Sequence, residues 1–104
     1  MSEICIIGAG PAGLMAAICA AAENAPTRLI EANAVAGRKL LLTGGGRCNL
    51  THLGTPAELA RAFGRAGRFL RHSLHELAPE AVRQFFLSRG LASIVEPDGK
   101  ERTA

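Results

Sequence analysis

Residues 8–13 read G-A-G-P-A-G, a glycine spacing of G-x-G-x-x-G that separates two segments of opposite structural preference. Residues 3–7 before it are short, apolar and β-branched, which is typical of a buried parallel strand. Residues 11–22 are rich in alanine and favour a helix. Residues 24–26 (Asn-Ala-Pro) end this helix, and residues 27–31 have the composition of a second strand. Strand, helix and strand within about 30 residues predict a right-handed βαβ unit.

The glycines of this segment have distinct roles if the segment binds a phosphate. Gly8 permits a tight turn, Gly10 removes the Cβ that would block a pyrophosphate, and Gly13 lets the helix lie close to the strand. The missing N–H of Pro11 costs nothing at the first helical position. Glu31 ends the second strand, where an acidic residue can accept hydrogen bonds from a ribose with a free 2′-hydroxyl, as in FAD or NAD. The combination predicts dinucleotide binding rather than an ordinary βαβ turn.

The second part of the chain predicts helices and a hairpin. Residues 55–58 read Thr-Pro-Ala-Glu, a capping box with proline at the first helical position. Apolar side chains then fall on one helical face, namely Leu59, Phe63, Leu70, Leu74 and Leu77. The basic side chains lie opposite, namely Arg61, Arg65, Arg68 and His72. Gly64 and Gly67 should split this stretch into two shorter helices. A further helix is expected over residues 79–89, and residues 91–99 begin a hairpin with its turn.

A second glycine-rich segment, residues 37–51, reads GRKLLLTGGGRCNLT. Its backbone N–H groups and three cations suit an anionic ligand, and a simple NAD dehydrogenase offers no explanation for it. The segment resembles the signature of bacterial NAD(P)/FAD-dependent oxidoreductases related to aminoacetone oxidase and to a bile-acid-reducing flavoenzyme, the HI0933-like flavoproteins. Residues 8–15 also match the FAD-binding amino terminus of that family. Asn33 and His52 depart from its pattern, which has a basic residue and an asparagine at these positions.

The resemblance implies an α/β fold of the glutathione-reductase type. A Rossmann-like FAD-binding βαβ unit with its glycine loop would occupy residues 1–52, and helices with a truncated hairpin would occupy residues 53–104 of the same, incomplete domain. The parent would be about four times longer. It would be an oxidoreductase that uses FAD, with NAD(P)H as a candidate electron donor.

The resemblance also implies a set of FAD-binding residues: Gly8, Gly10, Pro11, Ala12, Gly13, Glu31, Arg38, Lys39, Thr43, Gly44, Gly46, Arg47, Cys48 and Asn49. The first five would wrap the pyrophosphate and Glu31 would hold the adenosine ribose. Arg38 and Lys39 would flank the adenosine and phosphate side, and residues 43–49 would pass near the flavin. No residue is assigned as a catalytic acid or base.

Two alternatives to a flavoenzyme remain. One is an NAD-binding dehydrogenase, which leaves the second glycine segment unexplained. The other is a small basic nucleic-acid-associated module without enzyme activity, since the net charge of +3 comes from the second part of the chain, beginning with Arg61, Arg65, Arg68 and Arg71. We interpret these arginines as a solvated helix face because no readout motif accompanies them. Phe63 and Phe69 are expected in the core rather than as base-stacking platforms.

The uncharged run 4–22 is close to the length of a membrane span, but its glycines and proline argue against a spanning helix, and no basic segment precedes it. We therefore expect a cytoplasmic protein with reduced thiols. Cys5 and Cys19 are expected in the core, and Cys48 is interpreted as a packing residue or a neighbour of the flavin. No histidine has metal-ligand spacing, so no metal is expected. The expected partner is a small-molecule substrate, with neither nucleic acid nor membrane, and the oligomeric state is left open.

Overall fold

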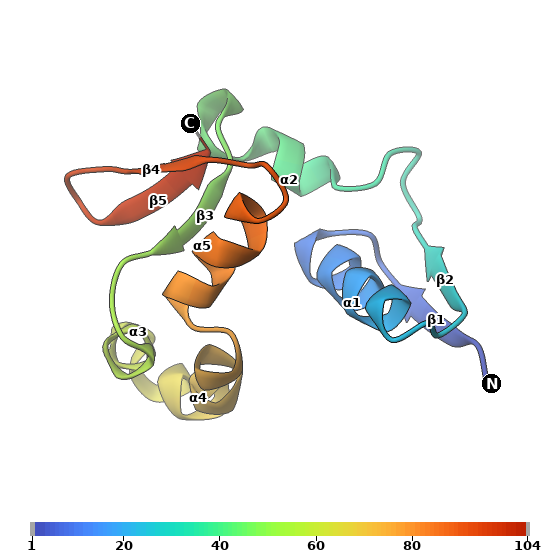
Figure 1. Cartoon of the computed structure of the whole chain (residues 1–104), viewed down its shortest axis with the longest axis horizontal. Helices are drawn as coiled ribbons and strands as arrows, with labels where there is room; N and C mark the ends of the chain where they lie inside the picture. The colour runs from blue at the N-terminus through green and yellow to red at the C-terminus, as the bar shows by residue number, and fades with distance from the viewer. Residues whose placement is uncertain (1, 104) are drawn as a thin grey trace. The chain divides into compact units, whose positions relative to one another are not determined.

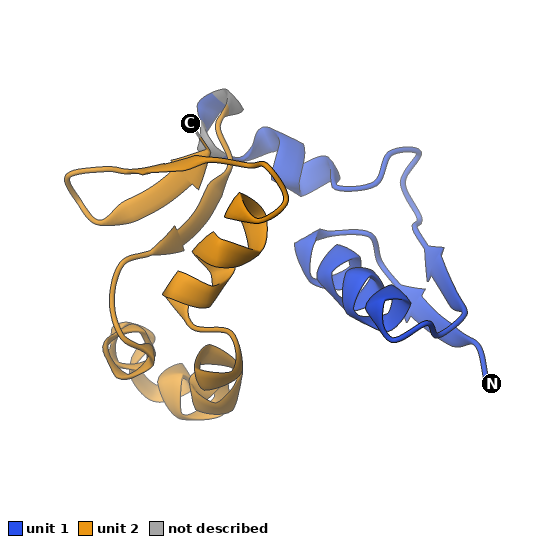
Figure 2. Ribbon diagram, in the orientation of Figure 1, with its two compact units in different colours: residues 1–46 blue, residues 47–104 orange. Residues whose placement is uncertain are grey.

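The computed structural model describes residues 2–103, with Gly44 and Gly46 described by their backbone alone (Figure 1). The chain divides into two units, Met1–Gly46 and Arg47–Ala104, which Figure 2 shows in different colours. Residues 47–52, which the sequence analysis grouped with the first segment, belong to unit 2.

Unit 1 contains the expected βαβ unit. Strands β1 (Ile4–Ile7) and β2 (Thr27–Ile30) pair in parallel, and helix α1 (Pro11–Ala22) connects them. The chain leaves α1 through Asn24, whose φ of 59° lies in the left-handed region that asparagine tolerates. The predicted parallel pair and its connecting helix are therefore confirmed, with boundaries within one residue of those expected.

The expected burial of this unit is wrong. Helix α1 contacts both strands, but Ile7 is 78% exposed and Ile30 is 45% exposed. Cys5 and Cys19, expected in the core, are both exposed free thiols. A parallel strand is buried when helices cover both faces of its sheet. Within unit 1, α1 packs on the pair, and the two strands remain largely uncovered.

The segment after β2 also differs from expectation. The glycine-rich segment of residues 37–51 is not one loop: it forms helix α2 (Arg38–Leu42), the 3-10 helix η1 (Thr43–Gly46) and most of the strand that follows. Gly37, with a φ of 67°, lets the chain turn sharply into α2. Arginine, lysine and leucine are all good helix formers, which explains the helix.

Unit 2 is built on a three-stranded antiparallel sheet of β3 (Asn49–His52), β4 (Ser93–Val95) and β5 (Lys100–Thr103) in the order β3-β5-β4. The hairpin predicted around residues 97–99 is confirmed as β4–β5. The central place of β5 was not predicted, because its pairing with β3 joins segments that are far apart in the sequence.

Four helical segments lie between β3 and β4: α3 (Pro56–Ala62), η2 (Gly64–Ala66), α4 (Gly67–Glu76) and α5 (Pro79–Leu87). The hydroxyl of Thr55 accepts the Glu58 N–H at 3.2 Å, which confirms the predicted cap, and Gly64, with a φ of 60°, splits the helices as expected. Phe63 and Phe69 are 54% and 87% exposed, so the prediction that both lie in the core is wrong. Among the described residues, no helix combines the length and the apolar character needed to cross a membrane.

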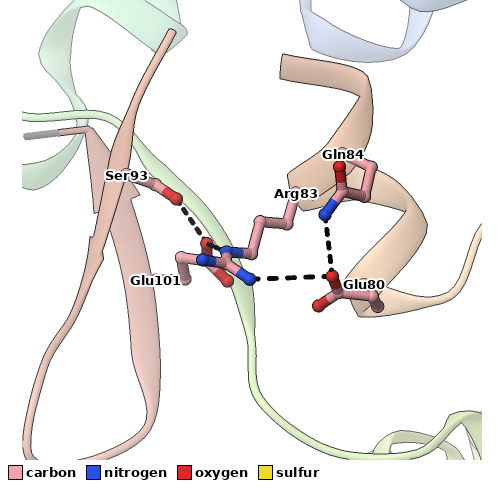
Figure 3. Close-up of polar contacts among 5 residues, drawn as sticks. All are labelled: Glu80, Arg83, Gln84, Ser93 and Glu101. Atoms are coloured by element: carbon pink, nitrogen blue, oxygen red, sulfur yellow. Dashed lines mark hydrogen bonds and ion pairs between the residues drawn. The ribbon is translucent and has the colours of Figure 1, made fainter. Parts of the chain in front are cut away.

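A polar cluster joins α5 to the sheet (Figure 3). Glu101 of β5 is 1% exposed, and its Oε1 lies 3.1 Å from Nε of Arg83 and also accepts the hydroxyl of Ser93. Arg83 lies 3.6 Å from Oε1 of Glu80, which accepts a hydrogen bond from Gln84 at 3.0 Å. A buried carboxylate is costly unless it is paired and hydrogen-bonded, so this cluster ties α5 to β4 and β5.

Candidate dinucleotide-binding site

In the turn between β1 and α1, both backbone polar groups of Ala9 form hydrogen bonds to residues outside the turn. Gly8 has a φ of 99°, and Ala9, which is 1% exposed, follows it. The N–H of Ala9 donates to Oε1 of Glu31 at 2.9 Å, and its carbonyl accepts the N–H of Gly37 at 2.7 Å. The glycine turn, the end of β2 and the start of α2 are thereby joined at one residue.

The glycines of the turn are required for different reasons. A Cβ on Gly13 would lie 1.7 Å from the carbonyl oxygen of Gly8, so only glycine lets α1 lie against the turn. Gly8 has a positive φ that other residues rarely adopt. Gly10 has a φ of −82°, and a Cβ there would have no neighbour within 4 Å. Nothing in the described part of the chain needs a glycine at position 10, and the space beside it is open.

This space lies at the N-terminus of α1, where backbone donors are free. Gly10 is the N-cap, no side chain caps the helix, and the first turn carries no acidic residue. Within residues 2–103, the N–H groups of Gly10, Ala12 and Gly13 have no acceptor. The first N–H groups of a helix ordinarily lack an intrahelical partner, and together with the helix dipole they suit a phosphate.

Glu31 lies at the end of β2 beside the turn. Its Oε2 accepts hydrogen bonds from the backbone N–H and the side-chain amide of Asn33, at 2.8 and 3.0 Å. The N–H groups of Asn33 and then of Ala9 hold the pKa of Glu31 below its ordinary value of 4.5, so the side chain is a carboxylate at neutral pH. A carboxylate has about four acceptor positions. Ala9 donates to Oε1 and Asn33 donates twice to Oε2, so Oε1 can also accept an external hydroxyl.

Two of the three cations expected at the site, Arg38 and Lys39, lie in α2. Arg38 and Lys39 are both exposed, and Nη1 of Arg38 lies 3.4 Å from Oδ1 of Asn33, which links Arg38 indirectly to Glu31. The hydroxyl of Thr43 donates to the carbonyl of Leu40 at 2.9 Å and so caps the end of α2. The surroundings of Gly44 and Gly46 lie outside the described part of the structure.

The remaining predicted residues belong to unit 2. Arg47 and Asn49 are exposed. The N–H of Cys48 donates to the Thr103 hydroxyl at 3.1 Å, and the Thr103 N–H donates to the Cys48 carbonyl at 2.9 Å, which fixes Cys48 to β5. The ring nitrogens of His52 lie 2.8 Å from the Leu53 carbonyl oxygen and 2.9 Å from that of Asp98, so this side chain fastens the β4–β5 turn.

Three residues that organise the site were not among the predicted site residues. Ala9 fills a buried position inside the turn, Asn33 orients Glu31, and Gly37 closes the turn from the other side. The small size of Ala9, between two glycines of the motif, could have predicted that this position is buried. The contacts of Asn33 and Gly37 depend on how the chain folds back after β2, for which the sequence carries no clear pattern.

A parallel βαβ unit with a glycine turn at its helix N-terminus and a carboxylate at the end of its second strand defines a Rossmann-type dinucleotide-binding domain. The chain matches the HI0933-like protein Rossmann domain over residues 2–101 and belongs to that family. This confirms the predicted family and fold class.

The curated proteins to which the chain is similar include a bile acid reductase and an RNA-modifying synthase. The chain is 37% identical over 93 residues to the 3-dehydro-bile acid delta(4,6)-reductase of Clostridium scindens, a match that covers 88% of this chain and 22% of that protein. It is 46% identical over 48 residues to the ribosomal RNA dihydrouridine synthase of Escherichia coli, covering 46% of this chain and 12% of that protein. The chain therefore spans less than a quarter of the length of either relative.

Proposed function

We propose that this chain is the amino-terminal FAD-binding part of a cytoplasmic flavin-dependent oxidoreductase. The main support for the proposal is the open space beside Gly10. Its backbone angles suit any residue and a Cβ would meet no protein atom, so glycine at this position is explained by the close approach of a ligand. The donors around it suit a pyrophosphate.

The other groups of the site fit the rest of a dinucleotide. The free acceptor position on Glu31 suits a ribose hydroxyl, and the carboxylate would repel a 2′-phosphate, which favours FAD or NAD over NADP at this site. Arg38 and Lys39 would add positive charge on the phosphate side. The segment 43–49 favours FAD over NAD, because a simple NAD dehydrogenase has no use for a second glycine-rich segment.

A bound flavin would supply the redox chemistry, taking electrons from a donor such as NAD(P)H and passing them to a substrate. The names of both relatives describe reductions: one is a reductase acting on a bile acid, and dihydrouridine is uridine with two hydrogen atoms added. We therefore extend the proposal to reduction of a carbon–carbon double bond in an organic substrate.

The test compares FAD binding by the unsubstituted chain and by Gly10→Val. The chain has no Trp or Tyr, so the visible absorption of a bound flavin is easily followed. Blocking two hydrogen bonds to charged phosphates, at about 1.5–3 kcal/mol each, should weaken FAD binding by at least about a hundred-fold. Ala16→Val, which places the same side chain at an exposed position of α1, is the matched control and should bind FAD normally.

Equal FAD affinity for Gly10→Val and the unsubstituted chain would contradict the proposed pyrophosphate position. A folded chain that binds NAD but not FAD would support the dehydrogenase alternative instead. Circular dichroism of each variant separates a lost ligand from a lost fold.

A further inference from the structure

We propose that the side-chain amide of Asn33 is a positioning group that keeps Glu31 and Arg38 from pairing with each other. The carboxylate then remains available for the ribose of the adenosine, and the guanidinium remains available for the phosphates. The inference rests on the proposed function, because it concerns the same dinucleotide site. It deepens that function by assigning the preference of the site for an intact ribose to a residue that acts through two others.

The backbone of unit 1 brings the two opposite charges to the same turn. Glu31 directly follows β2, and Arg38 is the first residue of α2. Ala9 holds both ends of this segment, because its N–H donates to Oε1 of Glu31 at 2.9 Å and its carbonyl accepts the Gly37 N–H at 2.7 Å. A carboxylate and a guanidinium attached to one turn in this way would ordinarily form a charge-assisted pair with each other.

The amide of Asn33 lies between the two charged groups instead. Its Nδ2 donates to Oε2 of Glu31 at 3.0 Å, and its Oδ1 accepts from Nη1 of Arg38 at 3.4 Å. Within residues 2–103, no ion pair joins Arg38 to Glu31, whereas three other arginines each pair with a glutamate. An amide carries a donor and an acceptor, so it satisfies both charged groups without neutralising either.

The hydrogen bonds also decide which side of the carboxylate stays open. The backbone N–H of Asn33 donates to Oε2 at 2.8 Å, so both donors of Asn33 meet the same oxygen of Glu31. The other oxygen, Oε1, accepts from Ala9 and can also accept a ribose hydroxyl. The N–H groups of Asn33 and Ala9 hold the pKa of Glu31 below its ordinary value, which keeps the carboxylate ionised without a neighbouring cation.

The first test compares the binding of ADP and 2′-deoxy-ADP to the full chain by isothermal titration calorimetry. ADP contains the adenosine, the ribose and the two phosphates that this site would hold, and the deoxy form lacks one ribose hydroxyl. The unsubstituted chain should prefer ADP about ten-fold, because a hydrogen bond to a carboxylate is lost with the hydroxyl.

Asn33→Ala removes the amide but retains the backbone N–H that holds Oε2 of Glu31. Arg38 can then pair with Glu31, so the preference for ADP should fall to about three-fold or less. The double variant Asn33→Ala/Arg38→Gln should recover most of the ten-fold preference, since no cation is left to occupy the carboxylate. Arg38→Gln by itself should weaken both ligands equally and leave their ratio unchanged. A merely structural role of Asn33 would not be rescued by removing Arg38.

The second test needs no ligand and follows the titration of the Glu31 carboxyl by carbon-13 NMR. With Asn33 present, Arg38→Gln should leave the pKa of Glu31 in place. In the Asn33→Ala background, Arg38→Gln should raise this pKa, because it removes a cation that then pairs with the carboxylate.

Arg28→Gln is the matched charge control for both tests. It removes a positive charge from an exposed ion pair with Glu3 in unit 1, and it should change neither the ligand ratio nor the titration of Glu31. Because Asn33 is exposed, Asn33→Ala should keep the circular dichroism spectrum of the unsubstituted chain.

Two results would overturn the inference. One is a preference for ADP that stays at its original value in Asn33→Ala or is not recovered when Arg38 is also replaced. The other is an effect of Arg38→Gln on the pKa of Glu31 that is the same with and without the Asn33 amide. A chain that binds neither ADP nor FAD would refute the proposed function, and the ligand-free titration would still decide whether Asn33 separates the two charges.

Discussion

Replacing Gly13 by alanine should destabilise unit 1, although alanine is the better helix former. The added Cβ would lie 1.7 Å from the Gly8 carbonyl oxygen and 2.9 Å from the Gly8 carbonyl carbon. Ordinary contact begins at 3.4 Å, so the start of α1 would have to withdraw by about 1.7 Å from backbone atoms that cannot rotate away.

Two opposing effects set the magnitude. Alanine gains up to about 1 kcal/mol over glycine in helix propensity. Overpacking in a close contact costs about 1–3 kcal/mol and occasionally more, and here the clash is with the backbone carbonyl group of Gly8. The withdrawal would also disturb the hydrogen bond between the Ala9 N–H and Glu31. We expect a net loss of about 1–2 kcal/mol in the free energy of unfolding.

Urea unfolding followed by far-ultraviolet circular dichroism measures this loss, since the chain lacks Trp and Tyr for intrinsic fluorescence. The matched variant is Gly10→Ser, where a Cβ meets no atom within 4 Å and serine is at least as good an N-cap as glycine. It should unfold within about 0.5 kcal/mol of the unsubstituted chain. If Gly13→Ala is as stable as the unsubstituted chain, α1 does not lie against the turn and the role assigned to Gly13 is wrong.

Two further predictions concern charged groups. The pKa of Glu31 is lowered on folding, so the stability that Glu31 contributes is present above the ordinary pKa of 4.5 and is lost as the pH falls through the folded pKa. Thermal melts of Glu31→Gln should therefore lack this acid-dependent loss. Melts of Glu23→Gln, a change at an exposed helix end, should retain it. Arg83→Gln should lower the free energy of unfolding in urea by about 1–3 kcal/mol, because it leaves Glu101 buried without its cation. This loss is smaller than for a fully buried pair, since Arg83 is 42% exposed. Adding Glu101→Gln should recover part of that loss, and an unchanged midpoint in Arg83→Gln would contradict the role of the pair.

Local chemistry accounts for the parts of the fold that were predicted correctly. The limits of α1 follow from Pro11 at its start and Asn24 beyond its end. The cap at Thr55 and the break at Gly64 likewise depend on neighbours within a few residues. The glycine spacing and Glu31 similarly identified the dinucleotide-binding turn, because strand, turn and helix are contiguous in the sequence.

Short-range spacing in the sequence predicted the βαβ unit, the glycine turn, the β4–β5 hairpin and the family, but not helix α2 or strand β3. Which apolar side chains are covered became visible only in the folded chain, because burial depends on segments that are distant in the sequence. Phe69, for example, was expected in the core, but it is 87% exposed in the folded chain. Tertiary structure also placed β5 between β3 and β4, buried Glu101, and joined Ala9 to both Glu31 and Gly37. These long-range pairings arise when the chain folds back on itself, and no local pattern specifies them.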